Sequence, residues 1–243
     1  MRPRSLKFLL DSKSTLLRKV YFFYNIYLRN FKYLKGGSQF DEDLYLSSFF
    51  AEDYIGKYVD LGCFHPTRDN NTFRFYKKNW TGINVDLNPT TIELFNFFRS
   101  KDINLNCAIS DKKTQKKMYF VDNLSPLNTL DQNHLKFLKK NFLFKNKDFK
   151  EKKIKTENVN NILKKYKFNK VDFLNIDLEG LEYEVIKSLD FKRFKINLIC
   201  IEILDHNKTS KNKSKKIHQI LKKNNFKYLK KIGVNSIFKN ISI

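Results

Sequence analysis

Two acidic residues, each at the end of an apolar segment, have the spacing of a nucleoside-binding site. Residues 58–66 (YVDLGCFHP) contain Asp60 and Gly62, and residues 82–89 (GINVDLNP) contain Asp86. A strand ending in a glycine turn, a helix-like segment and a second strand ending in an acid form a βαβ unit that binds a ribose. The pattern predicts an adenosyl ligand whose ribose hydroxyls are accepted by Asp86.

The turn after the first strand lacks a phosphate-binding signature. Gly62 permits a sharp turn and the close approach of a ligand to the main chain. Residues 63–66 (CFHP) do not supply the further glycines of G-x-G-x-x-G. An adenosyl ligand without a pyrophosphate is therefore favoured over NAD. The alternative for Asp60 and Gly62, an ordinary strand end with a tight turn, stays open.

Two later apolar runs also end in acids. Residues 171–180 (VDFLNIDLEG) predict a buried parallel strand that leads into Asp177 and Glu179. Residues 197–204 predict another buried strand, which carries Glu202. Ligands of open α/β sheets bind outside the carboxyl ends of the strands. The acids expected in one such cleft are Asp60, Asp86, Asp177 and Asp205.

The remaining pattern alternates helices and strands. Helices are expected at 41–50, around Phe73, Phe75 and Tyr76, and at 90–99, 156–166, 181–189 and 216–224; further strands are expected at 103–109, 118–121, 226–231 and 235–239. Ser38, Asn88 and Thr156 have side chains suited to helix N-caps, and Asn79 suits a left-handed position after a helix. Together these elements favour one α/β domain with a parallel sheet.

Composition and cysteine placement bound the class of protein. A chain of 243 residues with 41% hydrophobic content can form one α/β domain with a sizeable core. Cys63, Cys107 and Cys200 are far apart and predict free thiols in a reducing compartment. No apolar run reaches the length of about 18 residues that a membrane span needs, and no signal peptide is recognised. We therefore expect a cytoplasmic protein, with peripheral contact to the inner face of the membrane as an alternative.

The formal net charge of +23 is unevenly distributed. Residues 1–40 carry nine bases and one acid, residues 41–110 carry seven bases and ten acids, and residues 111–243 carry 32 bases and 14 acids. The segment that holds Asp60 and Asp86 is thus mildly acidic, and the excess elsewhere is lysine. Such a charge suits nucleic acid or an anionic membrane but does not require nucleic-acid binding.

Residues 1–37 read as a basic, aromatic helical extension. Their apolar residues recur at helical spacing, which suits an anionic membrane with Arg18, Lys19, Arg29 and Lys32 toward the head groups. The alternative is a helix docked on the domain or on a partner. Gly36 and Gly37 separate this extension from a domain over 38–243, which we expect to bind the cofactor without it. Residues 112–155 are expected to form a substrate-side insertion.

Short motifs along residues 38–205 together resemble the FkbM-type S-adenosylmethionine-dependent methyltransferases. The motifs are SQ (38–39), ED (42–43), VDLG (59–62), FHP (64–66), NT (71–72), WxGI (80–83), VDxNP (85–89), DIN (102–104), NxA (106–108), NT (128–129) and DFLNIDxEG (172–180), where x stands for a residue outside the motif. The resemblance implies a class I Rossmann-like methyltransferase fold, with a mostly parallel seven-stranded sheet and helices on both faces. It also implies O-methylation of a hydroxyl on a sugar, glycan, glycolipid or natural product, with S-adenosyl-L-methionine as cofactor.

The resemblance also assigns site residues. The cofactor-binding residues that it implies are Asp60, Gly62, Cys63, Asn71, Asp86, Leu87, Cys107 and Ala108. Asp177 would face the methyl group and is the first choice for the general base, with Glu179 and His65 as alternatives. Glu179 also suits a helix N-terminus, and His65 a structural turn. His65 stands where many family members have small or acidic residues.

Other chemistries stay open. A divalent metal held by Asp177, Glu202 and Asp205 is an alternative that the spacing does not demand, and no metal is predicted. A methyltransferase acting on RNA would suit the lysine excess, although no recognition module is apparent in the sequence. A non-catalytic, membrane-associated module with a retained fold is the second rival. The acceptor itself depends on residues 112–155, whose pattern does not identify it.

Overall fold

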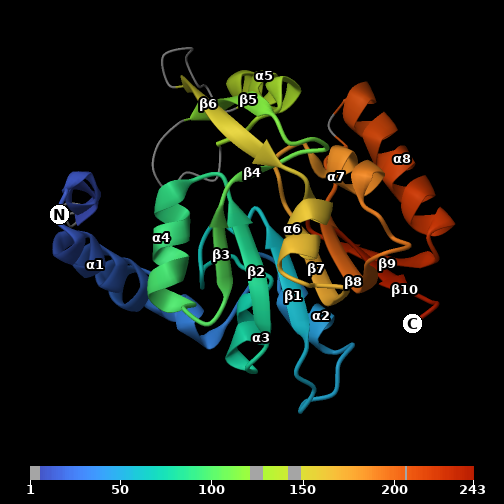
Figure 1. Cartoon of the computed structure of the whole chain (residues 1–243), viewed down its shortest axis with the longest axis horizontal. Helices are drawn as coiled ribbons and strands as arrows, with labels where there is room; N and C mark the ends of the chain where they lie inside the picture. The colour runs from blue at the N-terminus through green and yellow to red at the C-terminus, as the bar shows by residue number, and fades with distance from the viewer. Residues whose placement is uncertain (1–5, 121–127, 142–148, 206) are drawn as a thin grey trace.

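A seven-stranded sheet forms the centre of the computed structural model, which describes residues 6–120, 128–141, 149–205 and 207–243 (Figure 1). Its strands are β1 (Lys57–Leu61), β2 (Thr81–Asp86), β3 (Ile103–Asn106), β7 (Lys170–Ile176), β8 (Lys195–Glu202), β9 (Phe226–Ile232) and β10 (Asn235–Asn240). They lie in the order β3-β2-β1-β7-β8-β10-β9, and only β10 runs opposite to the other strands. The predicted fold class, a mostly parallel Rossmann-like sheet, is confirmed.

Helices cover both faces of this sheet because side chains alternate along each strand. In β1, Val59 and Leu61 pack toward the core beneath α6 (Val159–Lys165), α7 (Glu182–Ser188) and α8 (Lys208–Lys223). Tyr58 points to the other face, where Leu46 of α2 (Glu42–Ser47) and Phe75 of α3 (Phe73–Lys77) pack. The apolar runs that form β1, β2, β7 and β8 are thus strands buried on both sides.

The strand order reverses beside β1. The chain passes from β1 to β2 on one side, and β7 later pairs with β1 on the other side. Asp60 lies opposite Asn84 in β2 and Asn175 in β7. Such a switch point leaves a crevice at the carboxyl ends of the strands, which is where ligands bind in this class of sheet.

The predicted third strand is divided in two. β3 ends at Asn106, and β4 (Ala108–Ile109) leaves the main sheet to pair with β6 (Lys150–Glu157). With β5 (Gln115–Phe120), these strands make a second, three-stranded sheet, beside which lies α5 (Gln132–Asn141). Part of the expected insertion at 112–155 lies outside the described residues, as does the end of the strand expected at 118–121. β6 has the sequence KEKKIKTE and is largely exposed. It therefore lacks the alternation of apolar and polar residues by which a strand is recognised in a sequence.

Several helix boundaries differ from the sequence-based expectation. Thr156 does not cap α6, because it lies in β6 and its hydroxyl donates to the Lys112 carbonyl at 2.8 Å; Asn158 is the cap. α8 begins at Lys208 rather than 216, since Asn207 and Ser210 form a capping box before two turns without apolar residues. The Asn88 cap of α4 (Pro89–Phe98) is confirmed.

The N-terminal cap of α2 also differs from the prediction. The N-cap residue is Asp41 rather than Ser38, but the Ser38 hydroxyl still accepts the first-turn N–H of Asp43 at 3.1 Å and donates to the Asp43 carboxylate at 3.0 Å. Asp43 in turn pairs with Arg74 at 2.9 Å. The predicted left-handed conformation of Asn79, with φ of 64°, is confirmed. Ser38 thus joins the chain before α2 to α3 through Asp43.

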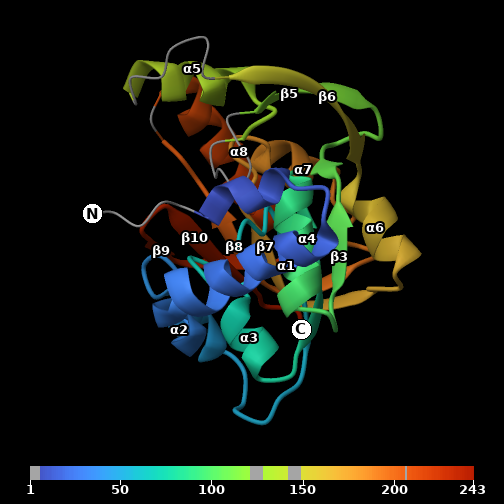
Figure 2. The ribbon, with the colours of Figure 1, turned by 90° about the vertical axis from the view of Figure 1, so that its left-hand side faces the viewer.

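The N-terminal segment packs on α4. Its elements are η1 (Leu6–Asp11), α1 (Thr15–Phe23), η2 (Tyr24–Arg29) and η3 (Phe31–Lys35). Figure 2 shows α1 in front of α4, and the buried side chains of Tyr21, Phe22 and Ile26 cluster with Leu94. Arg18 donates to the Glu93 carboxylate at 2.8 Å. In the described residues, no helix is long and apolar enough to cross a membrane.

Candidate functional site

A cleft of about 370 Å³ lies at the carboxyl ends of β1, β2 and β7. All the residues predicted to bind the cofactor line it: Asp60, Gly62, Cys63, Asn71, Asp86, Leu87, Cys107 and Ala108. Asp177 and Glu179 line the same cleft, but His65 and Asp205 are not among its lining residues. Residues far apart in the sequence therefore meet at the switch point of the sheet.

Gly62 makes the close approach between β1 and β7. Its φ is +85°, and a Cβ there would stand 1.6 Å from the carbonyl oxygen of Asp177. The N–H of Gly62 donates to Val85 O at 2.9 Å, and the N–H of Asp177 donates to Leu61 O at 2.9 Å. A side chain at position 62 would therefore displace Asp177 and separate the three strand ends that form the cleft floor.

The carboxylate of Asp60 links the loop after β1 to β7 beneath the cleft floor. Its buried carboxylate accepts from Thr72 Oγ1 at 2.8 Å, Asn175 Nδ2 at 2.9 Å and Asn70 Nδ2 at 3.1 Å. Burial raises the pKa of Asp60, and these hydrogen bonds oppose that rise. Asn71 Nδ2 donates to Asn175 Oδ1 at 3.0 Å. Asp60 is thus engaged mainly in fixing the loop after β1 against β7.

Asp86 presents a carboxylate at the end of β2. Its Oδ1 accepts the N–H of Asn88 at 2.7 Å, and its Oδ2 accepts the N–H of Phe64 at 3.1 Å. Each carboxylate oxygen has a second lone pair, so hydroxyl donors of a ligand can still be accepted. Burial raises the pKa of Asp86 to about 6.

Two residues at the cleft wall have left-handed backbones. Phe64 has φ of 49° and Glu179 has φ of 53°, a conformation that is unusual for residues with large side chains. Both line the cleft, one in the loop after β1 and the other in the loop after β7. Strained residues of this kind concentrate at ligand sites.

Arg68 is a cleft residue that the sequence analysis missed. Its guanidinium lies 4.9 Å from the centroid of the Phe64 ring, and it pairs with Asp69 at 3.6 Å. The atom that makes this ion pair is the buried Nε, which has no acceptor at hydrogen-bond distance among the described residues. No sequence pattern marks this loop position, because it becomes a cleft residue only through the fold around Phe64.

Acidic side chains form the wall of the cleft at β7 and β8. Burial, together with Glu179 and Glu182, holds the pKa of Asp177 well above its usual range. Glu182, which lies behind this wall and does not line the cleft, accepts the N–H of Leu178 at 2.8 Å, and burial raises its pKa to about 7. Burial and the charge of Asp177 also raise the pKa of Glu202. Carboxylates with raised pKa values are suited to general acid–base catalysis near neutral pH.

His65 is buried away from the cleft. Its Nδ1 accepts the backbone N–H groups of Thr67 at 3.2 Å and Arg68 at 3.0 Å, and its Nε2 lies 2.7 Å from Asn25 Oδ1. Since Nδ1 accepts, Nε2 carries the proton and donates to Asn25. Burial and the nearby Arg68 hold the pKa of His65 well below its usual range. The geometry argues against a catalytic base at His65 and assigns it to the turn.

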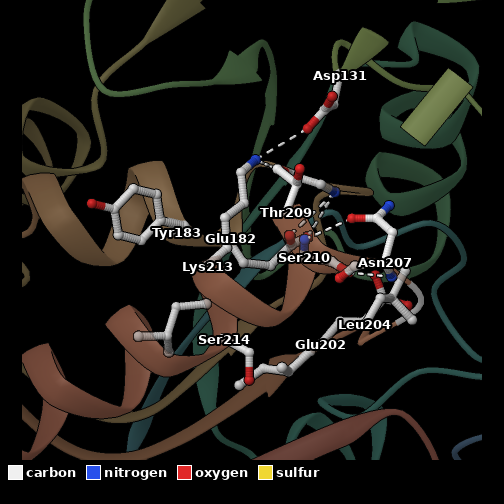
Figure 3. Close-up of a pocket in the computed structure, with 13 residues that line it drawn as sticks. Asp131, Glu182, Tyr183, Glu202, Leu204, Asn207, Thr209, Ser210, Lys213 and Ser214 are labelled. Carbon is white, nitrogen blue, oxygen red and sulfur yellow. Dashed lines mark hydrogen bonds and ion pairs between the residues drawn. The ribbon is translucent and has the colours of Figure 1, made fainter. Parts of the chain in front are cut away.

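A smaller pocket adjoins the acidic wall between α7 and α8 (Figure 3). Glu202 lines both this pocket and the cleft, and its buried Oε2 has no hydrogen-bond partner among the described residues. Lys213 closes the pocket by donating to Gly180 O at 2.9 Å and pairing with Asp131 at 3.2 Å. The described residues contain no group of three or more His, Cys, Asp or Glu arranged to hold a metal ion.

A methyltransferase family model matches most of the chain. The family model "Methyltransferase FkbM domain" matches residues 53–228. Among solved structures, the fibrillarin pre-rRNA processing protein of Methanococcus jannaschii is similar with a TM-score of 0.39 and 14% sequence identity; the match covers 78% of this chain and 68% of that chain. No curated protein matches the sequence. With its family match spanning most of the sheet and the cleft, the chain belongs to the FkbM methyltransferase domain family and is a methyltransferase.

Proposed function

We propose that the protein transfers a methyl group from S-adenosylmethionine to a hydroxyl oxygen of a sugar-containing acceptor. The observation that supports this most is the single cleft in which Asp86, the Gly62 turn and the acids Asp177 and Glu179 meet. It combines a ribose acceptor with carboxyl groups suited to proton transfer. The fold alone does not specify an acceptor, so the hydroxyl assignment rests on the chemistry of this wall.

The residues of the cleft fit the parts of the cofactor. Asp86 would accept the ribose hydroxyls with its remaining lone pairs. Arg68, whose buried Nε has no acceptor at hydrogen-bond distance among the described residues, would pair with the carboxylate of the methionine part. Cys107 and Ala108 would flank the adenine ring. When bound, the cofactor supplies an electrophilic methyl group on its sulfonium.

The acidic side chains of the wall would take the proton from the acceptor hydroxyl. A hydroxyl oxygen that gains a methyl group loses its proton, and Asp177 would take that proton, with Glu179 as the alternative base. Because the surroundings raise the pKa of Asp177, its carboxylate is a stronger base than usual, and its conjugate acid is weak enough to keep the proton during the reaction. Holding the hydroxyl in line with the methyl group would supply much of the remaining rate.

Transfer of a radiolabelled methyl group tests this function. Extracts separated into glycan, lipid, RNA and protein fractions are incubated with labelled S-adenosylmethionine and either wild type or Asp86→Ala. We expect label in the glycan or glycolipid fraction with wild type only, in a bond stable to mild alkali, as an ether is. Label confined to RNA would identify the rival RNA methyltransferase. Cofactor binding without label in any fraction would favour a non-catalytic module.

A further inference from the structure

The N-terminal segment has two apolar sides, and only one of them is buried. Tyr21, Phe22 and Ile26 face α4, whereas a second set of large apolar side chains is exposed. We call this second set the outer face; its members are Phe8, Leu16, Leu17, Val20, Phe23, Tyr27, Leu28 and Phe31. Each is between 39% and 70% exposed. Contiguous exposed apolar side chains of this kind mark interaction sites in soluble proteins.

The spacing of the outer face matches one stripe of a helix. Leu16, Val20, Phe23 and Tyr27 recur every three or four residues along α1 and η2, and Phe31 follows in η3. The buried residues lie between them in the sequence and face the opposite way, so docking on α4 does not cover the stripe. Figure 2 shows α1 on the outside of the molecule, in front of α4.

The charge around the outer face is almost entirely positive. Lys13, Lys19, Arg29, Lys32 and Lys35 are all exposed. The sequence contains no acidic residue between positions 12 and 40. A partner must therefore offer both an apolar phase and negative charge.

We propose that the outer face binds an anionic lipid bilayer, with the segment lying in the plane of the interface. Exposed leucine and aromatic side chains would enter the acyl boundary, and the flanking bases would contact anionic head groups. A second copy of the chain fits less well, because pairing two outer faces would bring their bases together. The proposal goes beyond methyl transfer, since it concerns a surface remote from the acidic wall.

Vesicle co-sedimentation of the full-length protein tests the proposal. Vesicles of phosphatidylcholine mixed with phosphatidylglycerol are compared with pure phosphatidylcholine at low and high salt. The apolar variant Leu16→Ser/Phe23→Ser/Leu28→Ser is matched by Ile55→Ser/Ile241→Ser, which alters exposed apolar residues elsewhere. The charge variant Lys13→Gln/Lys19→Gln/Lys32→Gln is matched by Lys211→Gln/Lys215→Gln/Lys222→Gln on α8, where the lysines are also exposed.

We expect the wild type and both control variants to sediment with the anionic vesicles at low salt. The two outer-face variants should bind at least about tenfold more weakly, because one removes side chains that would enter the acyl boundary and the other removes bases that would contact the head groups. Circular dichroism and binding of S-adenosylhomocysteine should match wild type, which separates this test from that of the proposed function. Wild type that ignores anionic vesicles, or equal losses in control and outer-face variants, would overturn the proposal. A dimer abolished by the apolar variant, without vesicle binding, would also overturn it and assign the face to self-association.

Discussion

Asn25 Oδ1 lies 2.7 Å from His65 Nε2, and this contact joins the N-terminal segment to the loop that follows β1. The same loop contains Phe64, whose N–H binds Asp86, and Arg68, which lines the cleft. The contact and the buried cluster with Leu94 argue against the expectation that the domain from residue 38 binds the cofactor without the segment. The segment is instead part of the support of the cleft.

Replacement of Asn25 tests this support. Asn25→Ala leaves the Nε2–H of His65 buried without its partner, which should cost about 1 to 3 kcal/mol of unfolding free energy. Urea denaturation measures the change, and Asn212→Ala on the exposed side of α8 is the matched control. Equal stability of wild type and Asn25→Ala would contradict a supporting role.

The buried imidazole of His65 should make the stability of the protein depend on pH. The pKa of His65 is held well below 6.5 in the folded protein, so the folded state binds fewer protons than the unfolded state. The stability that neutral His65 contributes should be complete above about pH 6.5 and fall as the pH drops toward the lower folded-state pKa. In His65→Gln, urea midpoints between pH 7 and 5 should fall less than in wild type; parallel curves would exclude this linkage.

Gly62 should tolerate no side chain. Gly62→Ala combines a left-handed backbone with a collision against Asp177 O, whereas Gly37→Ala has φ of +137° but no atom within 4 Å of the new Cβ. The Gly37 variant therefore measures backbone strain alone, about 1 to 3 kcal/mol. We expect Gly62→Ala to lose clearly more than Gly37→Ala in denaturant unfolding, together with cofactor affinity. Similar losses in both variants would show that the close approach to Asp177 is unimportant.

Arg68 should recognise the amino-acid end of the cofactor. Arg68→Met should weaken binding of S-adenosylhomocysteine by about 1.5 to 3 kcal/mol, the range for a hydrogen bond to a charged group. Binding of methylthioadenosine, which lacks the carboxylate, should change little. Arg193→Met, at an exposed arginine outside the cleft, is the control. Equal losses for both ligands would reassign Arg68 to a structural role.

Asp177 should govern turnover rather than cofactor affinity. Asp177→Asn should lower kcat by about 10² to 10⁴-fold, the usual contribution of a general base, and leave S-adenosylhomocysteine affinity within a few-fold. Because the pKa of Asp177 is raised, wild-type kcat should increase with pH as this group loses its proton. Asp205→Asn, an exposed acid outside the cleft lining, is the control. Parallel loss of binding and turnover would assign Asp177 to the cofactor.

The sequence predicts the parts of this fold whose pattern is local. β1, β2 and β7 are apolar runs bounded by acids and glycine, so their strands and the cleft at their ends can be inferred before the structure is known. The small sheet escapes prediction because β6 is lysine-rich and held by pairing with β4 and β5. The sequence names His65 as a site residue and does not mark Arg68, whereas in the structure Arg68 lines the cleft and His65 is buried away from it. Which of the two reaches the cleft depends on tertiary packing, which a local pattern does not reveal.

Calorimetric titration of the purified protein with S-adenosylhomocysteine tests the central claim most directly. Wild type and Asp53→Ala, which alters an exposed acid outside the cleft, should bind equally with micromolar-range affinity. Asp86→Ala should bind more weakly by about 1.5 to 3 kcal/mol, because the ribose hydroxyls lose a charged acceptor. Absence of binding by wild type, or equal binding by Asp86→Ala and wild type, would contradict an adenosyl site at the end of β2.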